Sequence, residues 1–183
     1  VSISNVRQIL FAGGKWVGNY ISPELEVPEA HRAVLMQVGA YARDHGHVAD
    51  EGINCGIDYF VSGDEVIVTE INARWTGGLF PAEFLRRLAI TQPAVAFFDM
   101  VPVAQSTAVQ TFQREHLFPA AGDAFAYVPM GFTPFAMEIE GAERYFVWQI
   151  VVGDFAAFVE AKRQTLPEDT FPTAELILQE ALS

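Results

Sequence analysis

The fold class is decided by residues 52–78, which read GINCGIDYFVSGDEVIVTEINARWTGG. Two β-favouring runs, residues 53–62 and 66–73, are separated by the segment Gly63-Asp64-Glu65. Glycine and aspartate are typical turn residues, and a short turn between two such runs predicts a β-hairpin. We therefore expect an antiparallel strand pair whose side chains alternate between two faces.

The second strand of this hairpin separates polar from apolar side chains. If the alternation is regular, one face carries Val68, Glu70, Asn72 and Arg74. The opposite face then carries Ile67, Thr69 and Ile71. Because the second set is the more apolar, we expect it to meet the core. The first set would then present a carboxylate, an amide and a guanidinium at the end of the strand.

The length of the loop sets which residues stand opposite each other. With a three-residue loop, Asp58 is directly opposite Glu70, with Cβ atoms roughly 5 Å apart. A two-residue loop would pair Asp58 with Thr69 and place the two carboxylates on opposite faces. We therefore expect the three-residue loop if the two carboxylates form a site.

Two carboxylates so close together repel each other unless a cation neutralises them. Mg²⁺ prefers hard oxygen ligands, typically one or two carboxylates with phosphate and water. Asn72 adds an amide oxygen, and Arg74 can bind phosphate or carboxylate oxygens in bidentate fashion. These residue types predict a site for a metal bound to a phosphorylated ligand. The alternative is a solvated, charged hairpin face with an ion pair.

The rest of the chain alternates between strand and helix patterns. Strands are predicted at residues 3–12 and 16–21, and a β-rich region at 124–152. Helices are predicted from Pro28 to Gly46, at 81–89, at 106–117 with Ser106 or Thr107 as cap, after the cap Asp154, and after Pro172. Residues 92–101 fit a buried helix or a strand. The pattern indicates an α+β fold, with a mostly antiparallel sheet and flanking helices.

Composition narrows the functional classes. The chain has 183 residues, 51% of them hydrophobic, and a net charge of −12 from 11 basic and 23 acidic residues. An acidic chain is unsuited to general nucleic-acid binding or to an anionic membrane. One cysteine, Cys55, cannot form an intramolecular disulfide, and no signal peptide or membrane helix is evident. We therefore expect a cytoplasmic protein.

Residues 52–78 resemble the C-terminal hairpin of ATP-grasp enzymes, in which an acidic residue or Gln on one strand precedes Glu-x-Asn-x-Arg on the next. The resemblance implies ATP with Mg²⁺ or Mn²⁺ as cofactors. It implies Asp58, Glu70 and Asn72 as metal ligands, and Arg74 as the catalytic residue that holds the phosphate or acyl-phosphate. The expected α+β fold is then similar to the C-terminal lobe of that family.

The resemblance extends over residues 1–90, and residues 91–183 would be a continuation or branch-specific extension on the same core. It implies a ligase that activates a small-molecule carboxylate, an amino acid or peptide among the candidates, as an acyl-phosphate for attack by an amine or thiol. Thr76 and Gly77 would be lesser members of the nucleotide site, or simply a turn and helix cap. Many amino-acid-ligating members have an arginine where this chain has Gly56.

The family completes its nucleotide site with an N-terminal lobe, which nothing before Val1 supplies. We therefore expect a C-terminal fragment that is inactive alone. Two alternatives stay open: a non-catalytic module for association or regulation, and a metal-dependent hydrolase that acts without ATP.

Other residues have both a functional and a plain interpretation. Lys15, beside Gly13 and Gly14, suggests a phosphate loop, but the Walker spacing is missing and a hairpin turn is expected. A small buried side chain is the expected role of Cys55. A metal pair or an ordinary loop would explain four residues after the first helix: His45, His47, Asp50 and Glu51.

The second half is rich in aromatic residues, which we expect to be mostly core, with any surplus forming an interface with the missing lobe or with a second copy in a homodimer. These residues are Phe125, Tyr127, Phe132, Phe135, Tyr145, Phe146, Trp148, Phe155 and Phe158.

Overall fold

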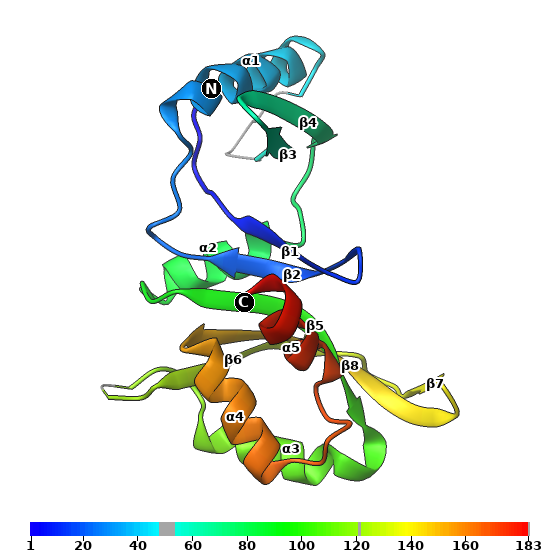
Figure 1. Ribbon diagram of the computed structural model, residues 1–183. Helices are drawn as coiled ribbons and strands as arrows, with labels where there is room; N and C mark the ends of the chain where they lie inside the picture. Colours follow the sequence, from blue (N-terminus) through cyan, green and yellow to red (C-terminus); the bar gives the residue numbers. More distant parts are fainter. Residues whose placement is uncertain (48–53, 121, 183) are drawn as a thin grey trace. The chain divides into compact units, whose positions relative to one another are not determined.

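A computed structural model describes residues 1–47, 54–120 and 122–182. The chain forms two compact units (Figure 1). Unit 1 comprises Val1–Val6 and Glu24–Ala89, and unit 2 comprises Arg7–Pro23 and Ile90–Ser183. Helices combine with a mostly antiparallel sheet, so the expected α+β class is confirmed. The segment Arg7–Pro23 groups with the later half of the chain, so the units are not simply successive in sequence.

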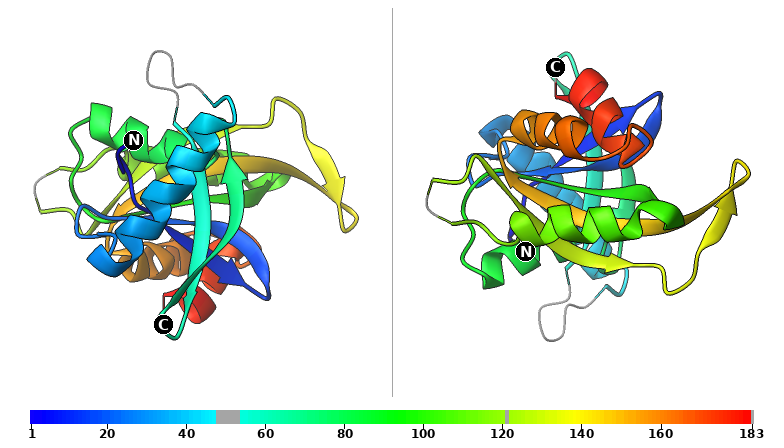
Figure 2. Two further views of the ribbon diagram at one scale, coloured as in Figure 1. Left: turned by 90° about the horizontal axis from the view of Figure 1, so that it is seen from above. Right: turned by 90° about the horizontal axis from the view of Figure 1, so that it is seen from below.

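Unit 2 is built on one sheet, which Figure 2 shows from two further sides. Its strand order is β1 (Gln8–Ala12), β2 (Lys15–Ile21), β5 (Ala94–Pro102), β8 (Ala142–Gly153) and β6 (Phe125–Phe132). The long strand β8 also pairs with β7 (Met137–Ile139), and all of these pairings are antiparallel.

The central strand β5 resolves the choice left open for residues 92–101. Its side chains are buried over nearly its whole length, on both faces of the sheet. Pro93 precedes the strand and Pro102 ends it, which leaves a run shorter than an ordinary buried helix. The segment is therefore a central strand.

The hairpin of β1 and β2 turns at Gly13 and Gly14, whose φ values are 55° and 72°. Positive φ at both central residues is what a type I′ hairpin turn requires, and glycine adopts it without steric cost. The hairpin-turn interpretation of this segment is confirmed, and Lys15 is the exposed first residue of β2. The first strand begins at Gln8 rather than at Ile3.

Helices cover one face of the sheet in unit 2 and enclose its core (Figures 1 and 2). These elements are η2 (Val103–Gln105), α3 (Ser106–Glu115), α4 (Phe155–Thr165), α5 (Pro172–Leu176) and η3 (Ile177–Ala181). The Asp154 carboxylate caps α4 by accepting hydrogen bonds from the amides of Ala156 and Ala157, at 2.9 and 3.1 Å, as predicted. The predicted cap of α3 is wrong: Ser106 lies inside the helix because η2 runs directly into it.

The aromatic residues of the second half divide between core and surface. Phe125, Tyr127, Phe155 and Phe158 are buried, as expected for core residues. Phe132 and Phe135 instead leave 75% and 64% of their surface exposed. The expectation that most of these aromatic residues belong to the core is therefore correct only for part of the set.

Unit 1 consists of helix α1 (Glu29–Asp44) against the hairpin of β3 (Gly56–Ser62) and β4 (Glu65–Asn72), followed by α2 (Leu79–Arg87). Gly46, with φ 96°, lies just after the end of α1, close to where the sequence predicted it. The ring of His31 on α1 meets Tyr59 on β3 edge-to-face, with centroids 6.1 Å apart. Helix α1 therefore lies against one face of the hairpin.

Candidate functional site

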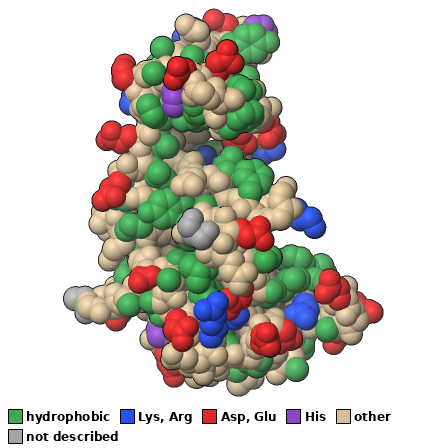
Figure 3. Space-filling view, viewed as in Figure 1, with side chains coloured by type: hydrophobic (Ala, Val, Ile, Leu, Met, Phe, Trp, Pro, Cys, Tyr) green, Lys and Arg blue, Asp and Glu red, His purple; other side chains and the backbone are tan. Residues whose placement is uncertain are grey.

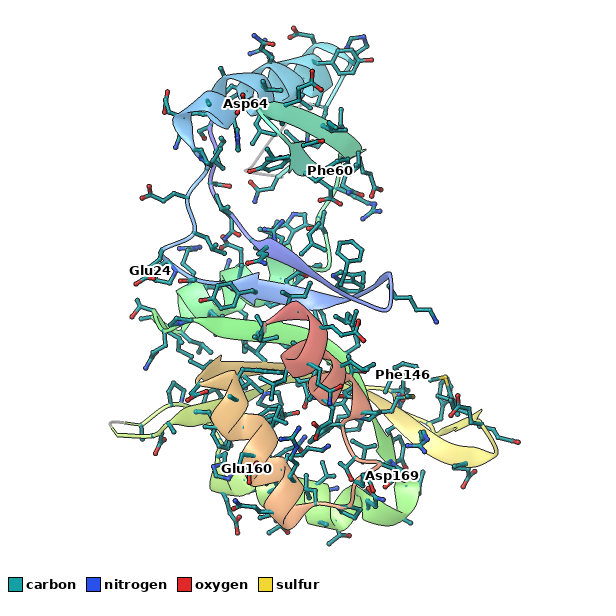
Figure 4. The ribbon with its side chains drawn as sticks, viewed as in Figure 1. Glu24, Phe60, Asp64, Phe146, Glu160 and Asp169 are labelled. Carbon is teal, nitrogen blue, oxygen red and sulfur yellow. The ribbon has the colours of Figure 1, made fainter. Side chains whose placement is uncertain are left out.

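The hairpin places Asp58 opposite Glu70, as the sequence predicts. The loop, however, has two residues, Gly63 and Asp64, because Ser62 pairs with Glu65. In Figure 4, Phe60 marks β3 and Asp64 marks this turn. Gly63 has a φ of 61° at the first central position, which suits glycine in a two-residue hairpin loop. The prediction of a three-residue loop is therefore wrong, although the predicted carboxylate pairing is correct.

A β-bulge reconciles the short loop with this pairing. Tyr59 pairs with Val68 while Asp58 pairs with Glu70, so Thr69 is the extra residue on β4. The Thr69 hydroxyl donates a hydrogen bond of 3.1 Å to the Asp58 carbonyl oxygen. The Thr69 side chain thus supplies a hydrogen bond to the Asp58 carbonyl oxygen at the bulge, where the backbone pairing of the two strands is irregular.

The bulge also changes which side chains share a face. Val68 and Ile71 lie on the same side, where with Val34, Val38 and Tyr41 they line a shallow groove of about 400 Å³ beside α1. The predicted division of the β4 side chains between two faces is therefore wrong. Val68 is separated from Glu70, and Ile71 is separated from Thr69, because one extra residue reverses the alternation.

Asp58, Glu70 and Asn72 come together on the face away from α1. The Asn72 amide nitrogen donates to an Asp58 carboxylate oxygen at 3.4 Å, and Asn72 is only 7% exposed. Glu70 is exposed and lies opposite Asp58 in the ladder. Two facing carboxylates suit Mg²⁺ when phosphate and water complete the coordination, and the Asn72 amide oxygen would join them only after the amide turns away from its present bond to Asp58. In the part of the chain that the structure describes, no three His, Cys, Asp or Glu side chains gather as a metal site.

The residues that follow β4 form a loop anchored to this end of the hairpin. The Arg74 amide donates to the Asn72 carbonyl oxygen at 2.8 Å, and the Arg74 side chain is exposed. The Thr76 carbonyl oxygen accepts a 3.0 Å bond from the Leu79 amide at the start of α2. Gly77 is exposed with open space around its Cα. The backbone of Thr76 thus has the role of a helix-start turn.

The glycine at position 56 has a steric reason. A Cβ atom placed on Gly56 would lie 2.7 Å from the Thr76 side-chain methyl carbon, closer than atoms can approach. Gly56 also pairs with Asn72 in the ladder. The Thr76 methyl group therefore occupies the space into which a longer side chain at position 56 would extend.

The structure describes two of the remaining candidates, His45 and Cys55, in detail. The His45 ring lies 3.9 Å from the ring of Tyr41 and contacts the Tyr41 carbonyl oxygen through Nδ1. Asp50 and Glu51 lie outside the described residues. Burial raises the pKa of the Cys55 thiol, which disfavours the thiolate that a nucleophile requires.

Sequence reasoning missed two residues beside the site. Trp75 directly follows Arg74, and its ring centroid is 5.1 Å from that of Phe80 on α2. Both side chains are exposed. The sequence feature that could have pointed to Trp75 is its position directly after Arg74, a predicted anion-binding residue.

In comparisons with known proteins, no family model, no curated protein and no solved structure matches the chain. Among the described residues, no helix combines the length and the apolar character needed to cross a membrane. Negative side chains outnumber positive ones on the face shown in Figure 3, as the net charge of −12 leads one to expect.

Proposed function

We propose that the end of the β3–β4 hairpin binds a divalent cation together with the phosphates of ATP. The chain would be part of an ATP-grasp-like ligase that joins a carboxylate to an amine or a thiol. The pairing of Asp58 with Glu70, with Asn72 bonded to Asp58 on the same face, carries the proposal.

Each residue has a role in this proposal. Mg²⁺ or Mn²⁺ would be held by Asp58, Glu70 and Asn72, and would neutralise charge on the phosphates. An oxygen of the substrate carboxylate attacks the terminal phosphorus, and ADP leaves. The amine or thiol then attacks the acyl carbon and loses a proton to solvent, and phosphate leaves. Arg74 is exposed at the end of the hairpin, where its guanidinium can hold the transferred phosphoryl group and stabilise its charge.

Titration calorimetry with a non-hydrolysable ATP analogue, with and without Mg²⁺, tests this function. We expect binding that depends on Mg²⁺ and that falls about tenfold or more, at least 1.4 kcal/mol, in Glu70→Gln and in Asp58→Asn. Glu65→Gln is a matched control, because Glu65 is an exposed carboxylate on the same strand at its other end.

Equal affinity of wild type and Glu70→Gln would rule out the metal-ligand assignment. Binding of the analogue that is indifferent to Mg²⁺ would contradict the proposed role of all three ligands. A loss of affinity in Glu65→Gln as large as in Glu70→Gln would show a general charge effect rather than a site.

A further inference from the structure

Strand β4 has an apolar outer edge. In the part of the chain that the structure describes, β4 pairs with β3 alone. Its regular part, residues 65–69, reads Glu-Val-Ile-Val-Thr and contains none of the lysine or proline residues that commonly protect an exposed edge. Ile67 in the middle of this segment is 37% exposed. An unprotected edge of β-branched residues is a surface on which another strand can pair.

The β6 edge of the larger sheet in unit 2 is protected, in contrast. Pro129 on β6 has no amide proton to donate to a further strand. A bridge from Leu117 to Tyr127 lies along the side of β6 that faces away from β8. Strand β4 carries neither kind of protection among the described residues.

The pairing within the hairpin determines which backbone groups of β4 face outward. Ser62 and Glu65 close the two-residue loop, so they occupy a hydrogen-bonded position of the ladder. Because such positions alternate along an antiparallel pair, Ile67 occupies the next one. Val66 and Val68 therefore turn their backbone N–H and C=O groups to the outer edge.

This edge is complementary to a second copy of itself. When two antiparallel copies are aligned about Ile67, Val66 of one copy stands opposite Val68 of the other, and their outward backbone groups meet. Glu65 stands opposite Thr69, so no two carboxylates face each other directly within residues 65–69. Ile67 stands opposite itself on the two-fold axis, as in any isologous dimer.

The groove beside α1 lies next to this edge. Its two strand residues, Val68 and Ile71, both belong to β4, and Tyr41 on its α1 side is 56% exposed. Val66 and Val68 share a face because they are two residues apart before the bulge. In the aligned pair, Val66 of the second copy therefore comes beside Val68 on the α1 face, where it removes apolar surface of the groove from water.

We propose that two copies of the chain form a dimer by antiparallel pairing of their β4 outer edges about Ile67. The two hairpins then make one four-stranded sheet, which is more stable than two strands alone. The dimer does not depend on the proposed metal site, because Asp58, Glu70 and Asn72 lie outside the paired segment.

Sedimentation velocity of the whole chain, without metal or nucleotide, tests this dimer. We expect wild type to pass from monomer to dimer as its concentration rises over about 1–100 μM. Ile67→Lys and Ile67→Glu should each weaken the dimer by about tenfold or more, because like charges then face each other on the two-fold axis. An equal mixture of the two variants should form dimers again, because opposite charges then face each other.

Val61→Lys is the matched control. Val61 is a β-branched residue on β3 that is 43% exposed, so the substitution adds the same charge to the other strand of the hairpin. The affinity of its dimer should stay within about twofold of wild type.

A wild type that stays monomeric over this range would overturn the proposal. A dimer of Ile67→Lys as tight as that of wild type would do the same, because the interface would then lie elsewhere. A mixture of Ile67→Lys and Ile67→Glu that stays monomeric would contradict the alignment about Ile67. An equal loss of affinity in Val61→Lys would show a general effect of added charge rather than an interface on β4.

Discussion

Asp99 links a central strand to the C-terminal helix of unit 2. Its side chain is 1% exposed and accepts hydrogen bonds from the amides of Met100, Thr173 and Ala174 at 2.8–3.0 Å. Burial raises its pKa from 3.8 to about 7, although these donors oppose the rise. A carboxylate on β5 thus accepts hydrogen bonds from the first amides of α5, of which the Ala174 amide also donates to the Phe171 carbonyl oxygen at 3.2 Å.

Replacing Asp99 by Asn should lower the free energy of unfolding by about 1–3 kcal/mol, because an amide group cannot accept all three bonds. The folded-state pKa exceeds the unfolded value, so the carboxyl contributes stability that is complete below pH 3.8 and is lost as the pH rises through about 7. The stability gap between wild type and Asp99→Asn should therefore narrow as the pH rises. Urea unfolding of both proteins between pH 5 and 8 measures this difference in the free energy of unfolding. A difference that widens as the pH rises would contradict the raised pKa of Asp99.

At the scale of elements, α4 and α5 are joined by an ion pair that is partly buried. Lys162, in the last turn of α4, is 1% exposed and its ammonium group lies 2.8 Å from a Glu175 carboxylate oxygen on α5. Arg163 contacts the same carboxylate. Burial raises the pKa of Glu175, but the bonds from Arg163 and Lys162 outweigh it and hold the pKa below 4.5. Glu175 is therefore the counter-ion of a buried lysine.

Glu175→Gln should destabilise the protein by about 3 kcal/mol, because it leaves Lys162 buried without its counter-ion. Glu160→Gln, which alters only exposed contacts with Arg163 and Gln164, should cost less than about 1 kcal/mol. Because the folded-state pKa of Glu175 is lowered, its contribution is present above pH 4.5 and is lost as the pH falls below it. Thermal unfolding of wild type and both variants at pH 7 and pH 4 measures these losses of stability. An equal loss of stability in the two variants at pH 7 would contradict the role of Glu175 as counter-ion of the buried lysine.

At the scale of the whole molecule, the two units differ in the size of their cores. The hydrophobic core cluster of buried residues lies wholly within unit 2, between its sheet and helices. The described strands of unit 1, β3 and β4, pair only with each other. A two-stranded sheet is marginally stable unless other elements pack on it. The candidate site is thus built on the less extensively packed unit.

Native-state hydrogen exchange should resolve this difference. We expect amides of β5 and β8 to exchange only through global unfolding, and amides of β3 and β4 to exchange at least tenfold faster through local opening. Addition of Mg²⁺ with the ATP analogue should slow exchange in the hairpin if the proposed site binds it. Equal protection of β4 and β8 in the free protein would show a single cooperative unit.

Local elements of this protein could be predicted from its sequence. The turn at Gly13 and Gly14, the hairpin that carries Asp58 and Glu70, and the cap at Asp154 depend on residues only a few positions apart. Steric preference and side-chain alternation act over this range, so a single stretch of sequence contains the necessary information. The α+β class follows from the order of such elements.

Only the tertiary structure decided the features that need residues far apart in the chain. The bulge at Thr69 depends on how two strands align, which is why the carboxylate pairing was predicted with the wrong loop. Strand β2 pairs with β5, more than 70 residues later in the chain, and Asp99 bonds to an amide 74 residues away. The exposure of Trp75 depends on what packs around it. Burial and long-range pairing are properties of the folded chain as a whole, so local sequence patterns do not specify them.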